Sequence, residues 1–219
     1  MSSHHIVKDD QEPALIIANG AACSRELLNQ LLEWSPFIVV LDSAMKRVMD
    51  LGIKVDVLLG DFDREFETHV YQDLQYPIEI IHTPDQNKTD LEKAYDFLIS
   101  RNFKAVNVVW ATGKRSDHTF QNISGIAAYR HLKIVLFDDH SKLFLLPIRF
   151  EKWYPKDTVL SLMPIGHVTG VHSENLYYTL YDDALTLGYR SGSSNHVLAD
   201  GIVKITHDNG DLILMECWD

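Results

Sequence analysis

The chain has 219 residues, of which 46% are hydrophobic and 23% are charged, and its formal net charge at pH 7 is -11. These values are typical of a globular protein with one large or two small domains. The acidic balance argues against nucleic acid or an anionic membrane as a partner, because both carry negative charge. Cys23 and Cys217 form neither a disulfide framework nor a zinc-binding motif.

The sequence shows no targeting or membrane signal. Its start, residues 1–13, lacks the basic segment and the apolar stretch of a signal peptide. No apolar run approaches the roughly 20 residues that span a bilayer. We therefore expect a cytoplasmic protein.

The first two thirds of the sequence alternate apolar runs with helical patterns. The runs expected to form buried strands are residues 14–19, 37–42, 55–61, 78–83, 105–112 and 133–138. Runs without polar alternation are typical of parallel strands that helices cover on both faces. Helices are expected after Ser24, after Thr89, which forms a capping box with Glu92, and after Ser116.

The pattern changes after about Leu146. Short strand-like runs then follow one another with turn signals between them, and residues 207–211 are a strong hairpin signal. We predict an α/β fold with two domains. Residues 1–146 form an open, mostly parallel α/β sheet, and residues 147–219 form a small all-β sandwich.

Acidic residues stand at the ends of the predicted strands. Asp42 ends one strand, Asp61 and Asp63 lie at the end of the next, and Asp90 follows the strand at 78–83. Ligands of open α/β sheets bind beyond the carboxyl ends of the strands, and Mg²⁺ prefers oxygen ligands. Any one of these aspartates is more simply a helix cap or a turn residue. The four together, with the close pair Asp61 and Asp63, predict a magnesium site for phosphate chemistry.

Two common nucleotide-binding motifs, the Walker-type phosphate loop and G-x-G-x-x-G, are absent from the sequence. A phosphate donor is therefore expected to be held by metal and by cations in the strand-end loops. Lys88, Lys114 and Arg115 are the candidates. Each of them, taken alone, is more simply a solvated surface charge.

One predicted helix begins with polar side chains, at Asp117, His118, Gln121 and Asn122. They either line a pocket or cap the helix. In the predicted β domain, residues 189–195 form a dense run of hydrogen-bonding residues. This run is either a plain loop or a site for a polar heterocycle.

Together these segments resemble the thiamine pyrophosphokinase family. The resemblance rests on GDFD (60–63), DQNKTDLEKA (85–94), ATGKRSDHTFQN (111–122) and SGSSN (191–195). The order of these segments matches the family over nearly the whole chain, as does the succession of an α/β domain and a β-sandwich. The resemblance implies transfer of a pyrophosphoryl group from ATP to the hydroxyethyl oxygen of thiamine, with thiamine diphosphate and AMP as products.

The resemblance also implies roles for individual residues. The catalytic residues it implies are Asp61, Asp63, Asp90, Arg115 and Asp117. The residues expected around Mg²⁺ are Asp42, Asp61, Asp63 and Asp90. The residues expected to bind ATP are Asp42, Gln86, Lys88, His118 and Asn122, to which the strand-end positions add Lys114. The residues expected to bind thiamine are Ser194 and Asn195, to which the run of hydroxyl groups adds Ser193.

In this family two subunits pair, and each site combines the α/β domain of one with the β domain of the other. We therefore expect a homodimer with shared sites. The group that accepts the proton of the thiamine hydroxyl is either Asp117 or a metal-bound carboxylate. Two other functions also stay open: another Mg²⁺-dependent transferase with a nucleotide donor, such as a sugar transferase with an Asp-x-Asp motif, and a thiamine or nucleotide sensor without turnover. The sensor is supported by Asp42, which lies in LDSA where the family usually has Asp-Gly-Gly.

Overall fold

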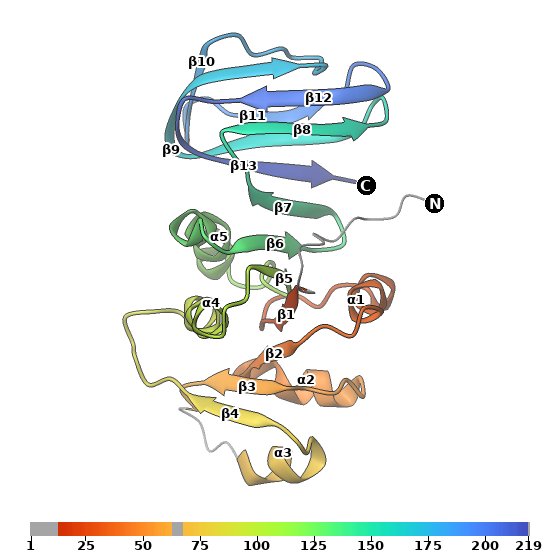
Figure 1. Ribbon diagram of the computed structural model, residues 1–219, viewed down its shortest axis with the longest axis vertical. Helices are drawn as coiled ribbons and strands as arrows, with labels where there is room; N and C mark the ends of the chain where they lie inside the picture. Colours follow the sequence, from red (N-terminus) through yellow and green to blue (C-terminus); the bar gives the residue numbers. More distant parts are fainter. Residues whose placement is uncertain (1–12, 63–67, 219) are drawn as a thin grey trace. The chain divides into compact units, whose positions relative to one another are not determined.

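The computed structural model describes residues 13–62 and 68–218, which divide into two compact units (Figure 1). The α/β unit runs to Gly125 and includes His131–Asp139. The β unit comprises Ile126–Arg130 and the chain from His140 onward. The domain boundary that the sequence places after residue 146 stays a prediction. Among the described residues, no helix has the length and apolar character needed to cross a bilayer.

The α/β unit is built on a parallel sheet in the order β4-β3-β2-β1-β5-β6. Its strands are β1 (Ala14–Ile17), β2 (Ile38–Leu41), β3 (Val57–Gly60), β4 (Glu79–His82), β5 (Ala105–Val109) and β6 (Lys133–Phe137). Every residue of β1, β2, β3 and β5 is buried, because helices flank the sheet (Figure 1). The mostly parallel sheet predicted from continuous apolar runs is confirmed.

Helices and 3-10 turns connect these strands. They are α1 (Arg25–Leu32), η1 (Asp42–Ala44), α2 (Met45–Asp50), α3 (Thr68–Leu74), α4 (Asp90–Ser100), α5 (Ser116–Ser124) and η2 (Gly125–Tyr129). The caps predicted at Ser24 and Thr89 are confirmed, the second with its capping box to Glu92. The cap predicted at Ser116 is wrong by one residue. Arg115 precedes the helix there without a side-chain cap bond.

The β unit contains antiparallel strands in the order β7-β13-β9-β12-β8, and β10 and β11 also pair with β9. Its strands are β7 (Ser141–Leu145), β8 (Arg149–Tyr154), β9 (Val159–Glu174), β10 (Asp183–Thr186), β11 (Gly192–His196), β12 (Gly201–Thr206) and β13 (Asn209–Cys217). The long strand β9 pairs with β11 and β13 in its first half and with β10 and β12 in its second. These pairings enclose one apolar core, as the predicted all-β architecture requires.

The hairpin predicted at residues 207–211 is wrong, although the chain does turn there. Both β12 and β13 pair with β9 instead of with each other. The Asp208 N–H donates to the Thr169 carbonyl oxygen at 2.9 Å, so the turn itself is held by β9. A turn signal predicts that the chain changes direction, but it does not predict which strand the next segment joins.

One charged cluster is buried within the β unit. Glu216 is 8% exposed and forms ion pairs with Lys142 Nζ at 3.0 Å and Lys152 Nζ at 2.8 Å. The Tyr154 hydroxyl donates a further hydrogen bond to Glu216 at 2.7 Å. Burial alone would raise the pKa of Glu216, but the two lysines and the tyrosine outweigh it and lower the pKa. This carboxylate is therefore fully compensated by its neighbours.

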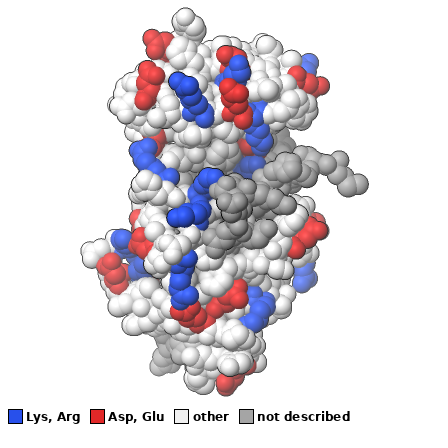
Figure 2. All heavy atoms as spheres, viewed as in Figure 1, with Lys and Arg blue, Asp and Glu red and all other residues white. Residues whose placement is uncertain are grey.

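Charges on the molecular surface are mixed. On the face that Figure 2 shows, Lys and Arg side chains are interspersed with Asp and Glu side chains. The formal net charge of -11 therefore does not collect in a single acidic patch on that face.

Candidate active site at the carboxyl ends of the parallel strands

Asp42 lies at the end of β2 and holds the segment that follows β3. Its side chain is buried, and its Oδ2 accepts a hydrogen bond from the Phe62 N–H at 3.1 Å. Its Oδ1 accepts from the Ser43 backbone N–H and, at 2.9 Å, from the Ser43 hydroxyl. A Cβ on Gly60 would lie 2.3 Å from Asp42 Oδ2, so only glycine fits there. Asp42 and Gly60 together fix the position of the GDFD segment.

Asp61 extends this segment beyond the sheet. The Gln86 amide donates to Asp61 Oδ2 at 3.4 Å, which joins the loops after β3 and β4. The His82 Nε2 atom lies 3.2 Å from the Asp61 carbonyl oxygen. Gln86 is therefore close to the predicted acidic site. Asp63 lies outside the described residues.

Asp90 is the first residue of α4 and faces the same group of carboxylates. Burial is the main cause that raises the pKa of Asp90, and the charges of Asp42 and Asp61 raise it further. The Lys93 ammonium, 3.1 Å from Asp90 Oδ1, opposes this rise. The charges of Asp42 and Asp61, which also follow strand ends, therefore act on Asp90.

Lys93 is a site residue that the sequence analysis missed. Its side chain is only 6% exposed, and it lies among the buried residues of α4. A lysine inside a helical pattern is ordinarily a surface residue, which is why it drew no attention. Its spacing of three residues from Asp90 was the available signal, because residues at i and i+3 meet on a helix.

The donor set for a metal ion is incomplete among the described residues. Within residues 13–62 and 68–218, no group of three or more His, Cys, Asp or Glu side chains is arranged to hold a metal ion. The fourth predicted carboxylate, Asp63, lies in the gap between these ranges. The magnesium site therefore stays a prediction.

Lys88 lies in the loop before α4, where the sequence predicted a phosphate contact. In this structure its ammonium bonds to Asp96 Oδ2 at 2.6 Å, and both side chains are substantially exposed. A groove of about 440 Å³ runs beside this pair, and Lys93 and Asp85 also line it. Both partners of this ion pair are exposed, and such pairs contribute little to stability.

Arg115 and Asp117 form an exposed pair at the start of α5. The guanidinium binds both carboxylate oxygens, at 2.5 Å and 3.1 Å. Hydrogen bonding from Arg115 is the largest cause that lowers the pKa of Asp117 to about 2. Asp117 is therefore a weak base in this arrangement. The exposed His118 donates its backbone N–H to Asp117 at 2.9 Å.

Two further residues predicted to contact the nucleotide, Asn122 and Lys114, lie near the end of β5. The Asn122 amide donates to the Ala111 carbonyl oxygen at 2.7 Å, which ties α5 to the end of this strand. The Lys114 ammonium donates to the Asn19 carbonyl oxygen, in the loop after β1, at 2.9 Å. The structure therefore gives Asn122 a structural bond and places Lys114 at the loop edge.

The predicted thiamine segment forms β11 in the β unit. Asn195 is 2% exposed, and its side chain exchanges hydrogen bonds with the backbone of Tyr178, at 3.0 Å and 2.8 Å. Ser193 and Ser194 are exposed, and the Ser194 N–H donates to the Ser161 hydroxyl at 2.9 Å. The segment therefore presents two hydroxyl groups, while its amide holds the neighbouring loop.

An aromatic surface lies beside this segment and was also missed by the sequence analysis. The rings of Tyr177 and His196 are stacked with their centroids 4.6 Å apart, and the Tyr178 ring meets Tyr177 edge-on at 5.0 Å. Tyr177 and Tyr178 are both more than half exposed. The two adjacent tyrosines in NLYYTLY were the available signal.

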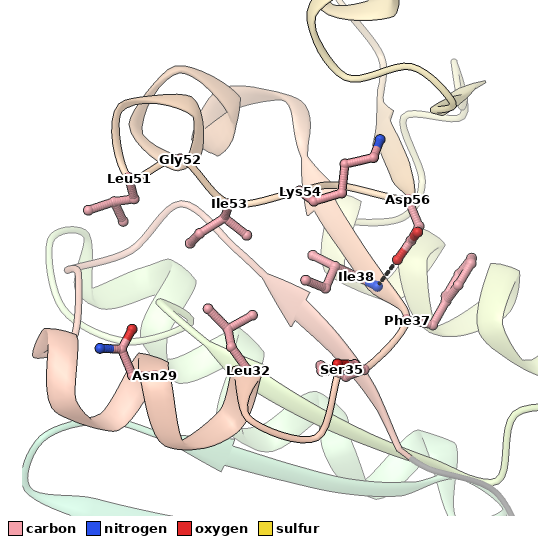
Figure 3. Close-up of a pocket in the computed structure, with 11 residues that line it drawn as sticks. Asn29, Leu32, Ser35, Phe37, Ile38, Leu51, Gly52, Ile53, Lys54 and Asp56 are labelled. Carbon is pink, nitrogen blue, oxygen red and sulfur yellow. Dashed lines mark hydrogen bonds between the residues drawn. The ribbon is translucent and has the colours of Figure 1, made fainter.

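A separate pocket of about 710 Å³ lies at the opposite edge of the parallel sheet (Figure 3). Ile38 and Asp56, at the amino ends of β2 and β3, line it with Leu32 and Ile53. Asp56 Oδ2 accepts a hydrogen bond from the Ile38 N–H at 2.8 Å across this pocket edge (Figure 3). None of the site residues predicted from the sequence lines it, so we place the candidate site at the carboxyl ends.

Two protein-family models match successive parts of this chain. Residues 28–137 match the family model "Thiamin pyrophosphokinase, catalytic domain", and residues 147–212 match "Thiamin pyrophosphokinase, vitamin B1 binding domain". Thiamine pyrophosphokinase 1 of rice is 30% identical over 176 residues, which cover 73% of this chain. The match spans 65% of the length of that relative.

Solved structures share the fold. The yeast thiamin pyrophosphokinase superimposes with a TM-score of 0.81 at 17% identity, over 96% of this chain and 88% of its own. The Bacillus subtilis thiamine pyrophosphokinase superimposes with a TM-score of 0.77 at 20% identity, over 94% and 99%. At these identities the likeness supports the architecture and not the residue roles.

Proposed function

Because this chain belongs to the thiamine pyrophosphokinase family, we propose that it transfers the pyrophosphoryl group of ATP to the hydroxyethyl oxygen of thiamine. The products are thiamine diphosphate and AMP. The observation that carries this proposal is the order of the two family matches. The catalytic match, 28–137, contains the gathered carboxylates, and the B1-binding match, 147–212, contains the exposed serine segment.

We propose that Asp61, Asp63 and Asp90 hold Mg²⁺ and that Asp42 supports them. An all-oxygen donor set fits this ion. The bond from the Phe62 N–H to Asp42 suits Asp42 to a supporting role, because it fixes the segment that carries Asp61. When bound, the ion would supply positive charge to the phosphate oxygens.

The remaining work of the protein is to position the substrates and to neutralise their charge. Lys88 and Arg115 are exposed in strand-end loops, and we propose that they bind non-bridging phosphate oxygens. The hydrogen bond from Arg115 lowers the pKa of Asp117, which disfavours it as the proton acceptor for the thiamine hydroxyl for as long as the two side chains stay paired. We therefore propose that a carboxylate of the Asp61–Asp90 group takes this proton.

We propose that Ser193 and Ser194 contact thiamine, with Asn195 holding the segment in place. Family membership also supports a homodimer in which each site uses the α/β unit of one subunit and the β unit of the other. A mixture of Asp61→Asn and Ser193→Trp proteins tests this arrangement. Shared sites predict that hybrid dimers regain activity, and sites within one subunit predict that the mixture stays inactive.

We also propose a cytoplasmic location. The sequence has only two cysteines, Cys23 and Cys217, and so lacks the disulfide framework that is common in oxidising compartments. Fractionation of cells that produce the protein at its natural level tests this proposal. Recovery of the protein with an oxidising compartment would contradict it.

A product assay tests the reaction. Purified protein is incubated with Mg·ATP and thiamine, and nucleotides and thiamine esters are separated by chromatography. AMP and thiamine diphosphate in equal amounts support pyrophosphoryl transfer. Formation of ADP and thiamine monophosphate would contradict pyrophosphoryl transfer, although ATP and thiamine would still be the substrates. Binding of both ligands without a thiamine-dependent product points to a sensor, and AMP formed with another acceptor points to a different transferase.

A further inference from the structure

Two cationic side chains converge on the loop that follows β1. Arg47 Nη2 donates to Asn19 Oδ1 at 2.8 Å and to the Gly20 carbonyl oxygen at 3.1 Å. The Lys114 ammonium donates to the Asn19 carbonyl oxygen at 2.9 Å and lies 3.5 Å from the same Oδ1. Arg47 and Lys114 thus share one neutral side chain as their acceptor, although they come from α2 and from the loop after β5.

No carboxylate offsets this pair of positive charges in the part of the chain that the structure describes. The ion pairs among the described residues include neither Arg47 nor Lys114. Desolvation lowers the pKa of both groups, and the charge of Arg47 lowers that of Lys114 further. Like charges held together without a counter-ion destabilise each other, and an anion between them relieves that repulsion.

Arg47 is held in place without an ion pair to any carboxylate that the structure describes. Its Cζ lies 4.4 Å from the centroid of the Trp110 ring, and the side chain is half-buried. Stacking of a guanidinium on an aromatic face restricts its rotamers, and the N–H groups in the guanidinium plane can still donate to oxygen acceptors, as Nη2 does here to Asn19 and Gly20. A cation fixed in advance in this way loses little entropy when it binds a phosphate group.

The pair stands at the topological switch point of the parallel sheet. The chain proceeds from β1 to β2 on one side, whereas β5 and β6 lie on the other side of β1. Ligands of open α/β sheets bind in the crevice at such a point. The two loops that border it are in close contact, since the Ala21 N–H donates to the Thr112 carbonyl oxygen at 2.8 Å. A Cβ on Gly20 would lie 2.2 Å from that same oxygen.

Arg47 is also connected to the carboxylate group through the chain. Asp42, whose carboxylate holds the GDFD segment, begins η1. The next element is α2, which carries the Arg47 guanidinium. One short segment therefore carries both Asp42, which supports the proposed metal site, and Arg47 of the cationic pair.

We propose that Arg47 and Lys114 form a binding site for a phosphate group of the nucleotide. The identity of the ligand as a nucleotide rests on the proposed function; the preference for a phosphate anion rests on the two cations. Arg47 carried no signal in the sequence, because it lies inside a helix and outside every motif. This site acts without Mg²⁺, which separates it from the carboxylates.

The test is AMP binding in the presence of EDTA, measured by calorimetry. The unaltered protein is expected to bind AMP with an affinity that falls as salt rises. Arg47→Met and Lys114→Met are each expected to weaken AMP binding about tenfold or more, because each removes a charge-assisted hydrogen bond. Adenosine, which has no phosphate, serves as the second ligand and is expected to bind all three proteins alike.

Arg101→Met is the matched control variant. Arg101 also lies over an aromatic ring, with its Cζ 5.0 Å from the Phe97 centroid, but it is paired with Glu79 at 2.6 Å. Its loss is expected to leave AMP affinity unchanged. Methionine at position 47 retains contact with Trp110, and the exposed Lys114 gives a second variant that does not depend on that packing.

Three results overturn the proposal. They are AMP affinity unchanged in both variants, an equal loss of adenosine affinity, and no AMP binding by the unaltered protein. The proposed reaction is judged separately. If the unaltered protein makes thiamine diphosphate while both variants keep full AMP affinity, this inference alone fails. If the variants lose AMP affinity but no thiamine-dependent product forms, the proposed function alone fails.

Discussion

The two units arrange their charged side chains in opposite ways. In the β unit, Glu216 is surrounded by Lys142, Lys152 and Tyr154, so its charge is compensated. At the strand ends of the α/β unit, the charges of Asp42 and Asp61 raise the pKa of Asp90, and Arg47 and Lys114 share Asn19 as an acceptor. Grouping like charges lowers stability in the absence of a ligand. The difference therefore separates charges that hold the fold from charges that, in the proposed function, bind metal and phosphate.

The sharpest way to break this comparison is Asp61→Asn. We expect turnover to fall between about a hundredfold and a thousandfold, since the proposed metal site loses one of its carboxylates. We expect the free energy of unfolding to stay equal or to rise, because repulsion of Asp90 is relieved. Steady-state kinetics and urea denaturation measure the two effects. A large loss of stability with little change in turnover would place Asp61 among the structural charges.

Glu216→Gln tests the other side of the comparison. Removing the carboxylate leaves two lysines without their partner, so we expect the free energy of unfolding to fall by about 3 kcal/mol. Glu174→Gln is the control, because its ion pair with Lys204 is exposed and is expected to contribute little to stability. Urea denaturation measures both variants. Equal stability of the two proteins would show that burial adds nothing to the Glu216 cluster.

The pH dependence of stability sharpens the same contrast. The folded pKa of Glu216 is lowered from its usual value of 4.5, so its stabilising contribution is present above pH 4.5 and is lost as pH falls through the folded pKa. The stability difference between the unaltered protein and Glu216→Gln is therefore expected to be constant near pH 7 and to shrink in acid. A difference that stays constant down to the acid transition would contradict the lowered pKa.

Lys93 differs from the other charges of the α/β site, because it forms an ion pair with one of the carboxylates, Asp90. We therefore expect it to affect the reaction. Lys93→Met is expected to change the Mg²⁺ concentration that gives half-maximal activity by about tenfold, and Lys93→Arg is expected to restore most of it. An activity titration with Mg²⁺ at saturating ATP measures the effect. A loss of thermal stability with an unchanged Mg²⁺ response would make Lys93 purely structural.

The smallest effect is expected for Asn122→Ala. Its amide bond to the Ala111 carbonyl oxygen predicts a loss of about 1 kcal/mol in unfolding free energy and an unchanged KM for ATP. Thermal denaturation and initial rates at varied ATP measure these quantities. A rise in KM at unchanged stability would instead support the nucleotide contact that the sequence predicted.

The sequence predicted the parallel sheet and the carboxylates because both follow from local patterns. Continuous apolar runs indicate buried strands, and Asp42 and Asp61 stand where such runs end. Lys93 and Arg47 were missed because both lie within helices, where a basic residue is ordinarily solvated. Their importance depends on contacts with another loop or with a neighbouring carboxylate, and these contacts are set by tertiary packing.

The errors at Ser116 and at residues 207–211 have a related cause. Cap and turn residues predict where the backbone changes conformation, but not which atoms then satisfy it. At the start of α5 the Asp117 carboxylate accepts the His118 N–H, so the nearby serine is not needed as a cap. The strands on either side of residues 207–211, β12 and β13, each pair with β9 and not with each other.

Because Gly60 and Asp42 are in close contact, the residue at one position limits which residues the other position can accept. A methyl group at position 60 would overlap the Asp42 carboxylate, so alanine there is excluded for as long as the aspartate is present. A lineage that lost the carboxylate would be released from this restriction, and position 60 would then drift. We expect related sequences to keep or to lose glycine and aspartate jointly, so that the pair records whether the site has remained under selection.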